Sequence, residues 1–372
     1  MLTQIPWKFW LKKIAQVSLT LLLVLALWYA ELIVYGLRQG YGQFKILWNT
    51  QPVATLLADA TVPDSVKNKL KLILEIRQFA FDSLGLKHSD NYTTFYNTQG
   101  RPLLWVVTAC EPYRLKAKEW DYAFLGKMSY KGFFEWDKAA DLVTQLRTEG
   151  WEADIGEVEA WSTLGWFRDP VLSSMLRLPV GDLAQLIIHE LTHGTLYIKD
   201  NVDYNENLAD FIGDQGAIRF LKAKYGAQSV QLRRHLEGEA DMKRFYEFFI
   251  QAAKQLDGLY KSFAPDLPTA QKESRKQVFL KEVATQFDTV AFHQPQRFRG
   301  VFRKRIKNPI FAAIFKGLRG KTTFNTYPKN TFFMSILRYR GIQNNFENEF
   351  SSRFGSNFPA YLSFLKKKYA VY

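Results

Sequence analysis

Residues 189–193 read His-Glu-Leu-Thr-His, the HExxH pattern, and no other stretch constrains the fold of this chain as strongly. Side chains four residues apart lie one above the other on a single face of an α-helix, so both imidazoles can reach one metal ion while Glu190 lies beside it. With only five histidines in 372 residues, the expected number of chance matches is well below about one in a hundred. The pattern therefore predicts a helix that binds a metal ion.

A catalytic zinc ion usually takes three protein ligands and leaves a fourth position for water, so a third donor is expected downstream. Glu206 lies far enough after His193 for the first helix to end, turn at Lys199-Asp200-Asn201 and be followed by a second helix. Asp210, one turn beyond Glu206, is placed to accept a hydrogen bond from a ligand histidine and fix its ring. The alternative is that Asp203 and Glu206 form a capping box at the start of the second helix.

The predicted site holds a single Zn²⁺ through His189, His193 and Glu206, and it indicates a reaction class. Zinc lowers the pKa of a bound water towards neutrality, and Glu190 is the general base that accepts the proton. Glu190 can later pass the proton to a leaving amine. We therefore expect metal-assisted hydrolysis, with a peptide or protein as substrate.

Composition limits the possible partners. An apolar content of 47% and an aromatic content of 16% favour one large or two modest globular domains over disorder. The formal charge of +14 comes from scattered residues without a nucleic-acid-binding motif, so we expect no nucleic acid and favour contact with an anionic membrane surface. The only cysteine, Cys110, excludes an internal disulfide.

The N-terminal segment has the length of a membrane span. Three lysines precede an apolar run from Ile14 to Ala30, which continues after Glu31 to Leu37. Such a run predicts a transmembrane helix within residues 1–38, a lipid bilayer as partner, and a cytoplasmic N-terminus with the rest of the chain outside. A cleaved signal peptide is the alternative, but no small-x-small pair follows the apolar run cleanly.

The remaining pattern predicts an α+β, mostly helical fold. Short β-type runs are expected at residues 103–108, 130–134 and 151–161, with an amphipathic helix at 137–147 packed against them. We expect four regions: the transmembrane anchor at 1–38, a helical lead-in at 39–90, a catalytic core with the HExxH helix and a small sheet at 91–225, and a C-terminal helical region at 226–372.

Two further residues are candidates for binding substrate. Glu159 on the third predicted strand could hold the free α-amino group of a peptide, although a solvent-facing strand side is the alternative. Trp166 lies in a loop of Gly, Pro and aromatic residues, which could form a wall of the substrate pocket.

Several blocks resemble a bacterial family named as putative zinc aminopeptidases, whose members are membrane-anchored or lipoproteins. These are NYTT at 91–94, LWVVTA at 104–109, YKGFF at 130–134, STLGWF at 162–167, HELTHGTLY at 189–197 and NENLADFIGDQGA at 205–217. More distantly, the site resembles gluzincins, in which HExxH supplies two ligands and the base, and a Glu on the next helix supplies the third ligand.

The resemblance implies a zincin-like core, with His189, His193 and Glu206 as zinc ligands, Glu190 as base and Asp210 as support. It also implies a location in the bacterial inner membrane, single-pass, with the catalytic part in the periplasm. The chain departs from relatives in three ways: its HExxH–Glu spacing is shorter than in thermolysin-like enzymes, and it lacks both a lipid-attachment cysteine and a GAMEN-type amine anchor. An envelope endopeptidase and a non-catalytic zinc-binding scaffold are the alternatives to an aminopeptidase.

Overall fold

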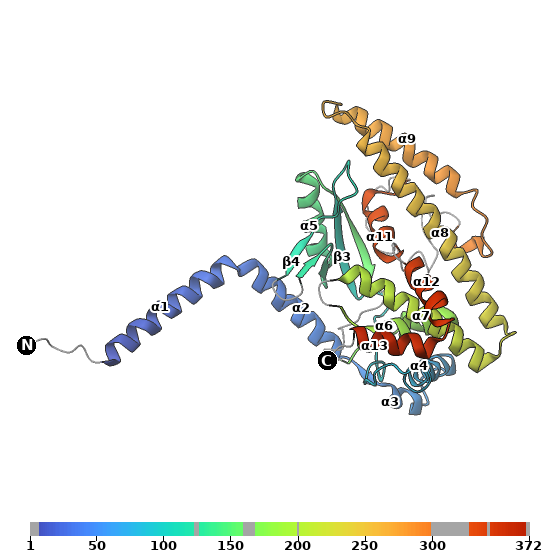
Figure 1. The fold of residues 1–372 in the computed structure, drawn as a ribbon. Helices are drawn as coiled ribbons and strands as arrows, with labels where there is room; N and C mark the ends of the chain where they lie inside the picture. The colour runs from blue at the N-terminus through green and yellow to red at the C-terminus, as the bar shows by residue number, and fades with distance from the viewer. Residues whose placement is uncertain are drawn as a thin grey trace, which may run out of the picture. The chain divides into compact units, whose positions relative to one another are not determined.

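The computed structural model describes residues 7–122, 126–158, 168–198, 201–298, 327–340 and 343–369. The chain divides into two compact units, Met1–Asn49 and Thr50–Tyr372. The second unit combines long helices with short strands (Figure 1), which confirms the predicted α+β, mostly helical fold class.

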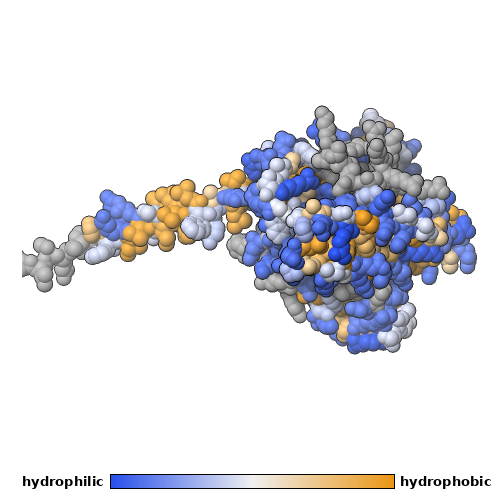
Figure 2. All heavy atoms as spheres, turned by 90° about the horizontal axis from the view of Figure 1, so that it is seen from above, coloured by the Kyte–Doolittle hydropathy of each residue, from blue (hydrophilic) through white to orange (hydrophobic). Residues whose placement is uncertain are grey.

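The N-terminal unit consists of two helices, α1 (Trp7–Trp28) and α2 (Ala30–Trp48), separated by a break at Tyr29. The apolar run that we predicted as one transmembrane helix is thus divided between them. No single helix in the described residues is long and apolar enough to cross a membrane. The two helices meet that requirement together, by length and composition, across a bend of 76°. Apolar side chains of α1, including Ile14, Val17 and Leu27, are exposed (Figure 2).

The second unit begins with elements that frame the later helices. In chain order they are β1 (Gln51–Pro52), α3 (Val53–Ala58), α4 (Asp64–Asp82) and β2 (Thr94–Tyr96). A short sheet has the order β1-β2-β8, in which β8 (Val171–Leu172) runs parallel to β2. Buried residues of α4 such as Leu70 and Ile73 face the core, and α4 packs on α6 (Val180–His193).

The predicted small sheet with a helix against it is confirmed. Its order is β6-β3-β7, and β3 pairs antiparallel with both neighbours. Val107 and Ile155 of the sheet pack against Ala139 and Val143 of the helix. The elements of this region are β3 (Leu104–Cys110), β4 (Trp120–Tyr122), β5 (Gly126–Met128), β6 (Lys131–Phe133), α5 (Trp136–Thr148) and β7 (Glu152–Val158).

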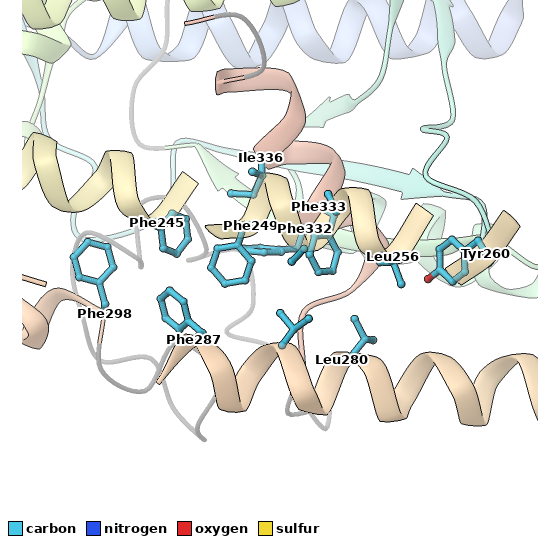
Figure 3. Packing of buried hydrophobic residues seen from close by; sticks show 13 residues of the cluster. Phe245, Phe249, Leu256, Tyr260, Leu280, Phe287, Phe298, Phe332, Phe333 and Ile336 are labelled. Carbon is cyan, nitrogen blue, oxygen red and sulfur yellow. The ribbon is translucent and has the colours of Figure 1, made fainter. Parts of the chain in front are cut away.

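In the C-terminal region, the regular secondary structure among the described residues is helical, and aromatic side chains fill its core. Phe245 and Phe249 pack against Phe287 and Phe332 with ring centroids 4.9–6.5 Å apart (Figure 3). The helices of this region are α8 (Val230–Lys261), α9 (Thr269–Phe287), α11 (Asn330–Arg340), α12 (Gln343–Phe354) and α13 (Phe358–Tyr369), with the one-turn segment η2 (Pro295–Arg297). Before this region, the one-turn segment η1 (Met175–Arg177) precedes α6, and α7 (Val202–Tyr225) follows it.

Buried polar contacts attach α11 to the sheet. Glu152 of β7 accepts the backbone N–H of Asn330 at 3.1 Å, and Asp154 accepts the Thr331 hydroxyl at 2.6 Å. The Asn330 side chain in turn accepts a hydrogen bond from Tyr260 of α8 at 2.7 Å. Because buried polar groups are costly unless they are paired, this network fixes the sheet relative to α8 and α11.

Two glycines allow α7 to approach α6 closely. A Cβ at Gly213 would lie 2.8 Å from the Gln185 carbonyl oxygen and 3.2 Å from Cβ of His189. A Cβ at Gly216 would lie 2.8 Å from both Ile188 Cγ2 and Leu84 Cδ1. Side chains at these positions would push the two helices apart, so their spacing depends on the absence of a Cβ at both.

Replacing Gly213 with Ala should therefore lower the free energy of unfolding by about 1–3 kcal/mol, because the added methyl overpacks the helix interface. The matched control is Gly258→Ala on α8, where nothing lies within 4 Å of the added Cβ and better helix propensity should leave stability unchanged or raise it by up to about 1 kcal/mol. Thermal unfolding of both variants measures the difference. Equal melting temperatures would contradict this account of the helix contact.

Candidate metal centre

Helix α6 presents the HExxH side chains from a buried position. Its apolar face, which includes Leu183, Ile187 and Ile188, packs in the core. His189 and Glu190 are each 9% exposed and His193 is 4% exposed. The two imidazoles meet across one turn, with their Nε2 atoms 3.2 Å apart. The Nε2 lone pairs of His189 and His193 can therefore point to a single metal position, as the spacing of four residues predicted.

Two asparagines fix the start of α7, which carries Glu206. Asn201 is the N-cap, and its side chain accepts the N–H of Tyr204 at 3.2 Å. Asn205 pairs with the backbone of Ile198 in both directions, accepting at 2.8 Å and donating at 2.7 Å. Asp203 lies inside the helix, so the capping-box alternative for Asp203 and Glu206 is wrong: the asparagine two residues earlier occupies the cap. Sequence reasoning missed Asn205, although it directly precedes the predicted ligand.

Glu206 reaches the two histidines across the α6–α7 contact. Its Oε2 lies 3.4 Å from Nε2 of His189, and its Oε1 lies 3.7 Å from Nε2 of His193. These are the residues that could together hold a metal ion in the described part of the chain. Ligands about 2.0–2.2 Å from a zinc ion at tetrahedral corners are about 3.3–3.6 Å apart, so the separations of the three donors fit such an ion.

Asp210 lies behind His189, one turn along α7 from Glu206. The Nδ1 atom of His189 donates a hydrogen bond to Oδ1 of Asp210 at 2.8 Å. This bond leaves Nε2 as the nitrogen that faces the other donors, and it fixes the orientation of the ring. Asp210 thus occupies the place expected for it, while its effect on metal affinity stays a prediction.

The charges of the buried donors depend on one another. Burial by itself would lower the pKa of His189, but hydrogen bonds to Asp210 and Glu206 outweigh it and raise the pKa well above 6.5. Burial, together with the neighbouring charge of His189, lowers the pKa of His193 to about 4. Burial opposes ionisation of Glu206, yet the hydrogen bond from His189 lowers the pKa of that carboxyl below its usual value. Without a metal ion, a proton on His189 balances the carboxylates.

Helix α13 packs against α7, the helix that carries Glu206. The Tyr204 hydroxyl donates to the Tyr369 hydroxyl of α13 at 3.1 Å, and the Tyr197 N–H donates to the Tyr369 carbonyl at 3.4 Å. Phe211 of α7 packs edge-on against Tyr361 of α13, with ring centroids 5.8 Å apart. Helix α13 therefore contacts both α7 and the segment that follows α6, the two segments next to the donors.

Glu159 and Trp166, the predicted substrate-binding residues, lie outside the described residues, as does most of the loop that carries Trp166. In β7, Glu157 pairs with Trp105 of β3. Both roles remain predictions.

Comparison with known families gives one result. The family profile described as "Putative aminopeptidase" matches residues 34–367, which include α6, α7 and all three donors. No curated protein and no solved structure matches the chain.

Metal binding should strengthen as pH rises. Because the pKa of His189 is raised, its proton must leave when a metal binds, and apparent affinity should rise about tenfold per pH unit below that pKa and level off above it. The Asp210→Asn variant should lower the affinity for the metal ion by about 10- to 100-fold. It also weakens the hydrogen bond that raises the pKa of His189, so the apparent affinity of the variant should stop rising at a lower pH than that of the native chain. Competition with a chromophoric chelator across pH measures both. Affinity independent of pH in the native chain would contradict this charge state.

Proposed function

Since the chain belongs to the putative aminopeptidase family, we propose that it hydrolyses peptide bonds with a zinc ion held by His189, His193 and Glu206. Family membership supports peptide hydrolysis in general. The observation that carries the finer proposal is the convergence of three donors from two helices beside the buried carboxylate of Glu190. The donor set of two imidazoles and one carboxylate is one that zinc accepts in catalytic sites.

In the proposed mechanism, zinc when bound lowers the pKa of a water molecule and polarises the substrate carbonyl. Glu190 accepts the proton of that water and passes it to the amine nitrogen as the carbon–nitrogen bond breaks. Burial of Glu190 keeps its carboxylate out of bulk solvent, so the proton stays available for the second transfer. Asp210 keeps His189 oriented through both steps.

We further propose a zincin-like arrangement of the core, in which the HExxH helix α6 and the ligand helix α7 lie next to each other. The contact between α6 and α7 is the most extensive among the described elements. A non-catalytic zinc scaffold is the alternative from another class. A structural zinc site normally closes with four protein ligands, whereas the donor group here has three members and an acid beside them.

The decisive variant is Glu190→Gln, which removes the base but none of the proposed ligands. We expect it to keep zinc and to lose about 10²- to 10⁴-fold in kcat on peptides. The matched control is Glu149→Gln at the exposed C-terminal end of α5, which should retain full activity. Zinc content by mass spectrometry and hydrolysis of a peptide library measure the two properties.

Three outcomes separate the alternatives. Hydrolysis of free peptides but not of N-acetylated ones supports an aminopeptidase. Cleavage of acetylated peptides would instead identify an endopeptidase. Full zinc occupancy without hydrolysis of any peptide would leave the scaffold as the better account.

The location follows as a separate proposal: residues 7–37 anchor the protein in the bacterial inner membrane, with the catalytic unit in the periplasm. The apolar composition of α1 and α2 supports this, and so do Lys8, Lys12 and Lys13, which favour a cytoplasmic N-terminus.

The full chain should stay in the membrane fraction after an alkaline carbonate wash, and a chain that begins at Thr50 should be released. In cells with a permeabilised outer membrane, added protease should digest the full-length protein. Release of the full chain by carbonate, or its protection from protease, would reject the anchor or its orientation.

A further inference from the structure

A buried histidine packs against the start of the HExxH helix. His235, in the second turn of α8, is 4% exposed. It lies so close to Gly181, the second residue of α6, that a Cβ at position 181 would be 2.6 Å from its Nδ1 atom. The absence of a side chain at Gly181 therefore allows the imidazole to lie directly on the backbone of α6.

Arg297 joins the same two helices beside this contact. Its Nη2 atom donates a hydrogen bond to Oδ2 of Asp182, the residue after Gly181, at 3.1 Å. A Cβ at Gly238 of α8 would lie 2.5 Å from its Nη1 atom, so the guanidinium lies against the backbone of α8. The first turn of α6 is thus held against α8 by His235 and by the ion pair of Arg297 with Asp182.

The ring of His235 is buried without a hydrogen bond. Neither Nδ1 nor Nε2 has a partner in the part of the chain that the structure describes. Charged groups act on the ring from three elements: Asp214 of α7, Asp182 of α6 and Arg297 of η2. Burial, the largest effect, and the positive charge of Arg297 lower the pKa of His235 below 6.5, although the two aspartates oppose them. At neutral pH the ring is therefore uncharged.

We propose that His235 is an acid-sensitive contact: a proton on its ring loosens the start of α6 from α8 and thereby weakens metal binding by His189 and His193. The effect on metal binding rests on the proposed function. A buried imidazolium is costly unless oxygen atoms accept its N–H groups. Because neither nitrogen forms a hydrogen bond in its present position, the charged ring can reach an acceptor only by moving relative to Gly181.

The pH range of this effect follows from the direction of the pKa shift. The folded chain holds the His235 proton more weakly than the unfolded chain, whose histidines have a pKa of about 6.5. The stabilising contribution of the neutral ring is therefore fully present above about pH 6.5 and is lost as the pH falls towards the lower pKa of the folded state. In that range, His235 alone should raise the unfolding equilibrium constant by up to about tenfold per pH unit.

The first test is His235→Leu, which removes the titrating ring and leaves an apolar side chain without an unpaired donor. In the metal-free protein, the melting temperature of the variant should fall less than that of the native chain between pH 7 and pH 5. The matched control is His88→Gln, at an exposed histidine, which should follow the native chain. His235→Gln, which is also uncharged, should behave like His235→Leu and serves if the leucine variant does not fold. Equal dependence on pH in the native chain and the His235 variant would overturn the proposal.

A second measurement links the contact to the metal centre. At pH 5.5, His235→Leu should bind zinc at least about fivefold more tightly than the native chain, whereas the two affinities should be equal at pH 8. Competition with a chromophoric chelator measures both. Equal affinities at pH 5.5 would overturn the effect of His235 on the metal centre. Failure of the native chain to bind zinc at either pH would instead reject the proposed function, and the melting temperatures would still decide the role of His235.

Discussion

The contact between α6 and α7 is the constraint on which the candidate site depends. Two donors come from one helix and the third from the other, so the distance between the helix axes sets the separation of His189 and Glu206. That distance is short because Gly213 and Gly216 of α7 lie against α6. Because protein interiors are close-packed, the residues at the helix contact fix the helix spacing. The distance between the donors therefore depends on helix packing more than on the donors themselves.

The charges of the candidate site also depend on neighbouring residues. Two partly buried carboxylates, Glu206 and Asp210, lie near the buried His189. Buried carboxylates need a cation close by, and the proton on His189 supplies one when no metal is bound. A metal ion that bound these donors would have to displace that proton.

The spacing of residues along the sequence predicted the helices and strands that depend on residues close together in the chain. The i, i+4 spacing of His189 and His193 was enough to predict helix α6, and the alternating runs and Asp137–Arg147 periodicity predicted the sheet and α5. The downstream carboxylates were found because Glu206 and Asp210 are one turn apart. The capping-box alternative named Asp203 as the cap of α7, whereas the cap is Asn201, because several side chains of the segment 200–203 can cap a helix and only the turn geometry selects one.

Contacts distant in the sequence could not be predicted in this way. The Tyr92 N–H donates to the Asp169 carbonyl, far along the chain, and the left-handed backbone of Tyr92 has no signature in residue type. The break at Tyr29 likewise interrupts a run whose hydropathy is continuous. The network that joins Glu152 and Asp154 to residues 330 and 331 spans much of the chain, and no period of 2 or 3.6 residues indicates it.

The hydroxyl pair of Tyr204 and Tyr369 has a consequence for synthesis of the protein. These residues are 165 positions apart. A ribosome that has made α6 and α7, the two helices that carry the donors, still has residues 226–369 to translate, and domains fold as their residues emerge. The helix that carries Glu206 therefore gains this contact only after Tyr369 has been translated, so a nascent or truncated chain that stops before Tyr369 carries all the donors but lacks this support.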